Sequence, residues 1–371
     1  MQFKQIIGQQ SIRQSLTETA RAERIPHAQL FLGPTGSGNL SLALAYAQYI
    51  LCTDKSETDA CGVCSSCKKS QKLIHPDIHF SYPCVGSKVL STHFIEQWRT
   101  AIFENPHLNV NQWLQSIGAE NKQGNINKDE CLDIIRKLSL KAFEGSHKIL
   151  LLWLPEYLAK EGNRLLKLIE EPPDNTVFLL VAENQEKILP TILSRCQLVK
   201  IPRLSDEEVA EGLRIKGLTE EKQLQEIVYL ADGNFNQALQ LIDQQKNDNA
   251  TILLDWLRKC YGGKGVDLHG WVEGIAKIGR ESQKHFLLYG LHFMREFLVL
   301  KMTGQSVVRL QTSELETAQK MLRVMDFEQV EKITKIMDHC YFAVERNAHP
   351  KILFLDASIK INGILKSKIT A

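Results

Sequence analysis

A glycine-rich turn between a short apolar strand and an Ala- and Leu-rich helix constrains the fold of this chain more than any other feature. Residues 28–32 (Ala-Gln-Leu-Phe-Leu) run directly into the turn at residues 33–41, and residues 42–47 begin the helix. Strand, glycine turn and helix in this order are typical of a phosphate-binding loop. The pattern therefore predicts an α/β domain with this turn at the end of a strand.

The turn lacks the groups that bind nucleotide. A working loop reads G-x-x-x-x-G-K-[S/T], in which the Lys contacts the β- and γ-phosphates and the hydroxyl holds Mg²⁺. Here Asn39 stands at the Lys position and Leu40 at the hydroxyl position. An amide does not neutralise phosphate charge, and Leu does not ligate a metal. We expect Gly33, Gly36, Gly38 and Asn39 to form a degenerate loop at which ATP is not bound or not hydrolysed.

Three further positions bear on ATP hydrolysis. A working strand at residues 148–154 should end in Asp-Glu, but Pro155 and Glu156 follow it, and Glu156 is expected only to favour the start of a helix. Gln237 stands where a working ATPase often carries Arg. Asn184 fits either a γ-phosphate sensor or an ordinary turn residue. The loss of ATP chemistry is therefore expected to involve several sites.

Length and composition suggest an ordinary soluble protein of two or three domains. The chain has 371 residues, 43% of them hydrophobic and 24% charged, and a net charge of +2. Nothing in this balance indicates a membrane or nucleic-acid binder. The first sixteen residues show no apolar segment typical of a signal peptide, and no apolar run approaches the roughly 18 residues of a membrane span. We expect a cytoplasmic protein without membrane contact.

The hydrophobic spacing divides the chain into three parts. Apolar strands at 28–32, 148–154 and 177–182 alternate with helical patterns at 3–24, 126–140 and 158–169, which indicates a parallel sheet with helices on both faces. This α/β domain is predicted to span residues 1–202, with a polar insertion of uncertain structure at about 84–125. Only helical patterns follow, and we expect a small helical domain at 203–246 and an all-α domain at 247–371. The helices of the small domain are predicted at 206–215, 220–231 and 236–244, and Gly262-Gly263 and Gly304 are expected to break those of the last domain.

Four cysteines occur within sixteen residues, in the spacing C-x8-C-x2-C-x2-C. Four thiolates complete a tetrahedral Zn²⁺ site and leave no open position, so the pattern favours a structural zinc module inserted into the α/β domain. Buried or redox-active thiols are the alternative. His75 and His79 lie nearby and are expected to be ordinary polar residues. The predicted ligands are Cys52, Cys61, Cys64 and Cys67.

The string Ser194-Arg195-Cys196 follows a short apolar segment. An Arg at the end of a helix is most often a surface charge. In a chain that also carries a degenerate phosphate loop, however, the Arg fits a ring ATPase, in which such an Arg reaches the γ-phosphate bound by the neighbouring subunit.

Several strings, taken in order, resemble the AAA+ clamp-loader subunits of bacterial DNA polymerase III. Together they cover about residues 4–240. The most specific are Glu170-Glu171-Pro172-Pro173 and Ser194-Arg195-Cys196. The motor subunits of that loader keep the Lys and the Asp-Glu pair, so their absence makes the chain more similar to the delta-prime subunits. The remaining strings that resemble the family are Ile6-Ile7-Gly8-Gln9, His27-Ala28-Gln29-Leu30-Phe31, the four-Cys spacing and His75-Pro76-Asp77.

The resemblance implies a non-hydrolysing subunit of a five-membered clamp loader, not an enzyme by itself. Arg195 would be a trans arginine finger for an adjacent motor subunit, with Ser194 and Cys196 holding its loop. The partners would be the gamma/tau and delta subunits and, through the assembled complex, the sliding clamp and primed DNA. The small domain would be a lid and the last domain a ring-forming collar. The alternatives are an active gamma/tau-like ATPase with an unusual loop and a degenerate AAA+ scaffold outside replication.

Overall fold

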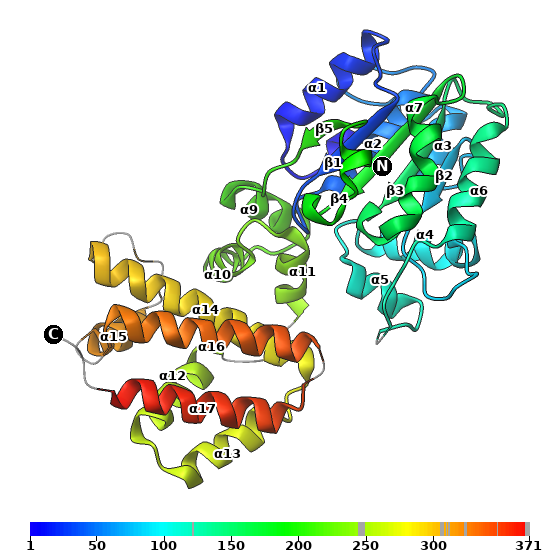
Figure 1. Ribbon diagram of the computed structural model, residues 1–371. Helices are drawn as coiled ribbons and strands as arrows, with labels where there is room; N and C mark the ends of the chain where they lie inside the picture. The colour runs from blue at the N-terminus through cyan, green and yellow to red at the C-terminus, as the bar shows by residue number, and fades with distance from the viewer. Residues whose placement is uncertain are drawn as a thin grey trace. The chain divides into compact units, whose positions relative to one another are not determined.

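The computed structural model describes residues 1–120, 122–243, 249–304, 308, 310, 312–322, 325–346 and 348–367. These residues form two compact units, Met1–Leu239 and Gln240–Ala371 (Figure 1). The predicted boundary between residues 246 and 247 lies outside the described residues, as does residue 244, the predicted end of a helix.

The first unit is built on a five-stranded parallel sheet, which confirms the predicted sheet type. The strand order is β2-β3-β4-β1-β5, so β1, which carries the glycine turn, lies between β4 and β5. Residues Leu30, Leu180 and Leu198 are neighbours across these three strands. The strands are β1 (Ala28–Leu32), β2 (Ile78–Ser81), β3 (Lys148–Trp153), β4 (Thr176–Ala182) and β5 (Gln197–Lys200).

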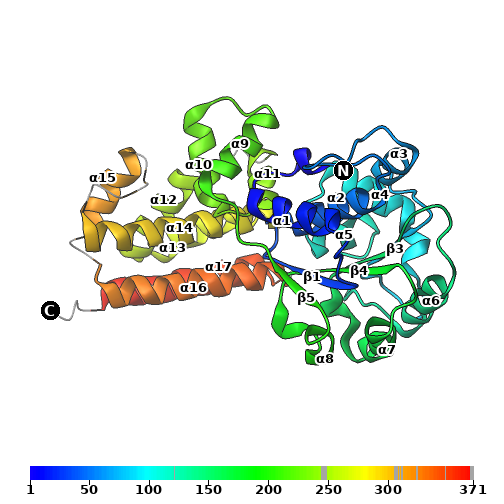
Figure 2. The same cartoon turned by 90° about the horizontal axis from the view of Figure 1, so that it is seen from above.

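Helices cover both faces of the sheet (Figure 2). Alternate strand residues point to opposite faces, so the sheet has a core on each side. Phe31, Leu151 and Leu179 contribute to the core shared with α2, and Leu30, Leu150 and Leu180 to the core shared with α6. The helices of this part are η1 (Phe3–Gln5), α1 (Gln10–Arg21), α2 (Asn39–Leu51), α3 (Ser65–Gln71), η2 (Ser91–Phe94), α4 (Ile95–Glu104), α5 (Val110–Ser116), α6 (Lys128–Ser139), η3 (Pro155–Leu165), α7 (Leu166–Glu170), η4 (Gln185–Lys187) and α8 (Pro190–Leu193).

Two of the predicted helices are wrong in extent. The helix expected at residues 3–24 is interrupted because Gly8 and Gln9 have positive φ angles of 60° and 57°, and α1 begins only after them. The helix expected at 158–169 is a 3-10 segment followed by the short α7, because Ala159 at φ 44° and ψ −135° leaves helical geometry. The apolar spacing still holds, since Leu158, Leu165 and Ile169 are buried.

The segment 84–125, predicted as an insertion of uncertain structure, forms part of the core. It contains η2, α4 and α5, and the side chains of Trp98 and Trp113 are fully buried. Trp98 stacks on Tyr82 at 4.2 Å between ring centroids and contacts Trp153 at the end of β3. Short helices give too few turns for a clear hydrophobic period, which is why the sequence pattern did not reveal them.

Three further helices follow the sheet, and the last of them runs across the boundary between the two units at Leu239. Ser205 precedes the first of these helices and forms the predicted capping box. The Ser205 side chain accepts from the Glu208 N–H, and the Glu208 carboxylate accepts from the Ser205 N–H. The helices are α9 (Asp206–Ile215), α10 (Glu221–Ala231) and α11 (Phe235–Asp243).

The described elements of the second unit are all helices. The predicted breaks are confirmed, since α12 ends at Gly262 and α14 ends before Gly304, whose φ is 79°. No helix in the described part of the chain is both long and apolar enough to cross a membrane. The helices are α12 (Asn249–Gly262), α13 (Gly265–Ile275), α14 (Arg280–Thr303), α15 (Thr312–Met321), α16 (Phe327–Glu345) and α17 (Pro350–Lys366).

Candidate functional site

The glycine turn has the backbone shape of a phosphate loop at the carboxyl end of β1. Gly36 and Gly38 adopt φ angles of 77° and 88°, which favour glycine. The Gly33 N–H donates to the Ala182 carbonyl of β4 at 3.1 Å, and α2 begins directly after Gly38. The predicted order of strand, glycine turn and helix is therefore confirmed.

Asn39 acts as a structural link within this loop. Its Nδ2 donates to the carbonyls of Gly33 and Ala182, both at 3.1 Å, and its Oδ1 accepts from the Leu40 N–H at 2.8 Å. Asn39 is 6% exposed and Leu40 only 2%. The position that carries Lys in a working loop is therefore occupied by a buried amide that joins the loop to β4.

The beginning of α11 covers the loop. The Phe235 N–H donates to the Gly36 carbonyl at 3.2 Å. A Cβ on Gly36 would lie 1.9 Å from Asn234 Oδ1, so the Asn234 side chain is in direct contact with the loop backbone. Ser37 within the loop is completely buried. Residues of the same chain therefore pack directly against the loop at Gly36 and Ser37.

The turn between α4 and α5 completes this cover. The His107 ring packs edge-on against Phe235, with 5.0 Å between centroids, and lies close to Gly38. Asn105 Nδ2 donates to Asn236 Oδ1 at 2.7 Å. Burial, reinforced by the Lys216 ammonium, lowers the pKa of His107 to about 4, so the ring is neutral near pH 7. We name the contacts of residues 105–107 and 234–236 with the loop the loop cover.

Gln9 ties the loop to the helical segment from a second side. Its Nε2 donates to the carbonyls of Ser37 and Pro202, at 3.2 Å and 2.8 Å, and its N–H donates to the Glu208 carboxylate at 3.0 Å. The string Ile6-Ile7-Gly8-Gln9 thus joins the loop, the segment that follows β5, and helix α9. The positive φ at Gln9 directs its side chain into this junction.

Two carboxylates, Glu156 and Glu183, lie beside the loop, but neither stands directly after β3, where a working ATPase carries its Asp-Glu pair. Glu156 Oε1 accepts from the N–H groups of Glu183 and Asn184 at 2.6 Å and 2.8 Å, so Glu156 fixes the end of β4 as well as starting η3. Burial raises the pKa of Glu183 to about 7, an effect that a hydrogen bond with Thr35 offsets and the Glu156 carboxylate reinforces.

The side chains of Asn184 and Gln237 have local partners. Asn184 Oδ1 accepts from the Glu186 N–H at 2.9 Å, which is the turn role that the sequence left open. Gln237 Nε2 donates to the Leu230 carbonyl at 2.9 Å.

Arg195 lies on the surface at the opposite end of the sheet from the loop. It follows α8 and directly precedes the amino end of β5, where Gln197 pairs with Gln29 of β1. Gly33 is four residues further along β1, or about 13 Å at the usual strand rise. The side chain of Arg195 is 32% exposed. Arg195 is therefore too far from the loop of its own chain to serve a ligand there.

Ser194 and Cys196 contact or flank this Arg. Ser194 Oγ accepts from Arg195 Nη1 at 3.2 Å, and Nη1 also donates to the Thr191 carbonyl at 2.7 Å. The Cys196 N–H donates to the Leu193 carbonyl at 3.3 Å, and its side chain packs against the core below α8. Burial raises the pKa of the Cys196 thiol to about 11, so it remains an uncharged packing group. The carboxylate of Glu170, at the end of α7, forms an ion pair with Arg195.

The four predicted ligands Cys52, Cys61, Cys64 and Cys67 converge. Their Sγ atoms all lie within 4.8 Å of one another, and Cys61 and Cys67 are 3.9 Å apart. Tetrahedral Zn–S bonds of about 2.3 Å place sulfur atoms about 3.8 Å apart, so the cluster has the size of such a site. The sulfurs of three of these cysteines accept backbone N–H groups at 3.3–3.4 Å, which favours thiolates. The residues present therefore fit a structural metal.

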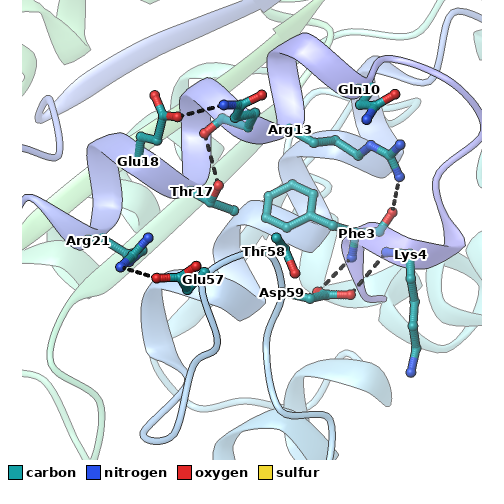
Figure 3. Close-up of a pocket in the computed structure, with 11 residues that line it drawn as sticks. Phe3, Lys4, Gln10, Arg13, Thr17, Glu18, Arg21, Glu57, Thr58 and Asp59 are labelled. Carbon is teal, nitrogen blue, oxygen red and sulfur yellow. Dashed lines mark hydrogen bonds and ion pairs between the residues drawn. The ribbon is translucent and has the colours of Figure 1, made fainter.

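The cysteine module is joined to the start of the chain. Asp59 accepts from the N–H groups of Phe3 and Lys4 at 2.9 Å and 3.0 Å, and Arg21 pairs with Glu57 across the adjoining groove (Figure 3). His75 is buried, and its Nδ1 accepts from the Asp77 N–H at 3.2 Å; it is not among the clustered ligands.

The model of the family described as "DNA polymerase III, delta subunit" matches residues 8–205, more than half of the chain. The chain belongs to this family. The predicted relation to subunits of bacterial DNA polymerase III is thereby confirmed.

Relatives with different subunit names match at similar identity. The tau subunit of Bacillus subtilis is 24% identical over 97% of this chain, and the delta' subunit of Haemophilus influenzae is 29% identical over 60%. The chain spans 61% and 58% of the lengths of these proteins. A solved gamma subunit-related protein of Thermotoga maritima is 16% identical, covers 90% of this chain and 99% of its own, and has a TM-score of 0.39. These relatives do not distinguish the delta-prime type from the others.

The loop cover and Glu156 are the functional features that sequence reasoning missed. Asn105, His107 and Asn234 carry no motif, and their partners are more than sixty residues away in the sequence. The helix predicted at residues 236–244 was assigned to the small domain, and nothing in the sequence indicated that its start lies against the loop.

Proposed function

We propose that the chain is the non-hydrolysing, delta-prime-like subunit of a DNA polymerase III clamp loader, which supplies Arg195 to the ATP site of a neighbouring motor subunit. The observation that carries this proposal is the separation of two sites. The glycines of the loop are buried beneath the chain's own residues, whereas the Arg195 side chain is partly exposed at the far end of the same sheet. A surface Arg that cannot reach its own loop suits a ligand held by another subunit.

The loop itself is unsuited to nucleotide for two independent reasons. Asn39 and Leu40 provide neither the charge nor the hydroxyl that a triphosphate with Mg²⁺ requires. The loop cover in addition bonds to the Gly36 carbonyl and places the Asn234 amide oxygen, an acceptor that repels phosphate, against the loop backbone. Restoring the missing side chains would leave the cover in place, so we propose that the chain does not hydrolyse ATP.

Membership of the family supports the partners. We propose gamma/tau and delta subunits as direct neighbours, with the sliding clamp and primed DNA bound by the assembled complex. The helices of the second unit would join the subunits in a collar. Arg suits the role at Arg195, because its guanidinium stays charged and grips two phosphate oxygens.

The test is Arg195→Ala in a reconstituted loader. Removal of an arginine finger lowers turnover by roughly 10³–10⁵-fold in GTPases, and we expect a loss of at least about 100-fold in DNA-stimulated ATP hydrolysis. Arg214→Ala is the matched control, because Arg214 is an exposed Arg of α9 that pairs with Glu221 of α10. Equal rates for the Arg195→Ala loader and the wild type would refute the role.

We further propose that the cysteine cluster holds Zn²⁺. A structural site of this kind contributes about 10 kcal/mol of local folding energy, so its removal should unfold the module. Elemental analysis should find about one zinc per chain and none after Cys64→Ser with Cys67→Ser. Full occupancy in that double variant would place the zinc elsewhere.

An active ATPase is the second candidate, because the B. subtilis tau subunit matches across nearly the whole chain. It would need to bind ATP at the loop without a Lys. A scaffold outside replication is the third, and the match to the family disfavours it. Isolation of the complex from cells distinguishes the scaffold, which would copurify with proteins other than polymerase III subunits.

A further inference from the structure

The guanidinium of Arg195 is held by an acidic residue from a separate sequence string. Glu170 is the last residue of α7 and begins the string Glu170-Glu171-Pro172-Pro173, in which the prolines prevent the helix from continuing. Its Oε1 accepts from Arg195 Nε and lies against Nη2 as well. The two strings that carry the family resemblance therefore meet in one ion pair.

The donors of the guanidinium can be counted. Arg has five N–H groups. Nε and one N–H of Nη2 face Glu170, and Nη1 uses its two N–H groups on the Thr191 carbonyl and Ser194 Oγ. The second N–H of Nη2 has no acceptor among the residues that the structure describes. A phosphate gripped by two donors must therefore replace some of these bonds.

The bonds differ in strength. All of these bonds have a charged donor, but only the bond to Glu170 joins two opposite charges, and the others end on neutral oxygens. The Thr191 carbonyl and the Ser194 hydroxyl are therefore displaced more easily than the Glu170 carboxylate. Their loss frees the end of the guanidinium formed by Nη1 and Nη2. The side of the guanidinium at Nε stays on Glu170.

We propose that Glu170 is a positioning residue for Arg195: it holds the Nε side of the guanidinium while the Nη1–Nη2 end turns to the neighbour's γ-phosphate. This inference rests on the proposed function of Arg195. The ion pair is 44% exposed on the Glu170 side, so it orients the side chain without contributing much to folding.

Steady-state ATP hydrolysis by the reconstituted loader tests the proposal. Glu170→Gln keeps the shape and an acceptor oxygen but removes the charge. We expect kcat to fall about tenfold with KM for ATP unchanged, because Arg195 acts on the transition state and not on ATP binding. Glu171→Gln is the matched control, since Glu171 is the adjacent, exposed Glu of the same string, and its rate should equal the wild type.

A double-mutant cycle separates positioning from an independent role. In the Arg195→Ala loader, adding Glu170→Gln should cause no further loss. A tenfold loss in that background, or no loss in the single Glu170→Gln variant, would overturn the inference while leaving the role of Arg195 intact. If Arg195→Ala itself has no effect, the proposed function fails and this inference fails with it.

A measurement on the chain alone supplies a readout that does not depend on the loader. The Nε–H of Arg195 should exchange with solvent several-fold faster in the Glu170→Gln chain than in the wild-type or Glu171→Gln chain. Equal exchange rates would show that Glu170 does not hold the guanidinium and would also overturn the inference.

Discussion

The glycine loop and the Arg195 turn lie at opposite ends of neighbouring strands and differ in almost every physical respect. The loop is largely buried, and Asn39, Phe235 and His107 of the same chain bond to it or pack beside it. The Arg195 side chain is partly exposed, and its guanidinium is held by contacts that another anion can replace. The first region has become part of the core, while the second remains available to a partner.

This contrast has a direct consequence for mutations. Substitutions at the loop should lower the free energy of unfolding of the chain and leave its chemistry unaffected. Substitutions at Arg195 should leave that free energy unchanged and lower the activity of the neighbour. Three substitutions test whether stability depends on the loop and not on Arg195, and their expected effects on stability decrease in the order given.

Phe235→Ala should have the largest effect. Phe235 is 1% exposed and packs against His107, the loop backbone and Gly212 of α9. Truncating a buried Phe costs about 3–5 kcal/mol in the free energy of unfolding, measured by urea denaturation. Phe103→Ala on α4 is the control, because Phe103 is 58% exposed and should change stability by less than about 0.5 kcal/mol. Similar values for both variants would mean that Phe235 does not pack on the loop.

Asn39→Ala should cost about 2 kcal/mol, because it removes the donor to the buried carbonyls of Gly33 and Ala182. Asn39→Asp should cost more, since it places an acceptor against the same two oxygens. Arg195→Ala serves as the exposed control, with an expected change below about 0.5 kcal/mol. A stable Asn39→Asp chain would contradict the hydrogen bonds assigned to this amide.

The smallest expected effect is the pH dependence from His107, which should amount to about 1 kcal/mol between pH 7 and 5.5. Its pKa is about 4 in the folded chain and about 6.5 when unfolded, so the unfolded chain binds the extra proton first as the pH falls. The stabilising contribution of the neutral ring is complete above about pH 6.5 and is lost progressively between pH 6.5 and 4.

Glu183, with its raised pKa, contributes the opposite trend as the pH rises toward 7, so the difference between wild type and His107→Gln isolates the histidine. On acidification, the free energy of unfolding should therefore fall more for the wild-type chain than for the His107→Gln chain. A constant difference across this range would mean that His107 is not buried in the loop cover.

The sequence revealed those candidate sites whose residues lie close together in the chain. The loop and the four cysteines were predicted from their spacing, because a turn or a metal site needs particular residues at short intervals. The Ser194-Arg195-Cys196 string was singled out because such an Arg is typical of ring ATPases. The parallel sheet followed from three apolar strands. β2 and β5 were missed because each has only four residues, and those of β5 are mostly exposed.

The loop cover and the Glu170–Arg195 pair were beyond the sequence for a different reason. Asn105 and Asn236 are 131 residues apart, and Glu170 and Arg195 are 25 apart. No local pattern specifies which of several Asn or Glu residues meet after folding. The core role of Trp98 and Trp113 was likewise hidden, since it arises from packing between short helices.

Titration of the isolated chain with ATP and Mg²⁺, followed by calorimetry, tests the central claim most directly. The buried loop and the Asn39 amide predict no binding up to millimolar ATP and no release of phosphate. Saturable binding with a micromolar Kd, abolished by Gly36→Trp in the loop, would show that the loop is a working nucleotide site and would contradict the account.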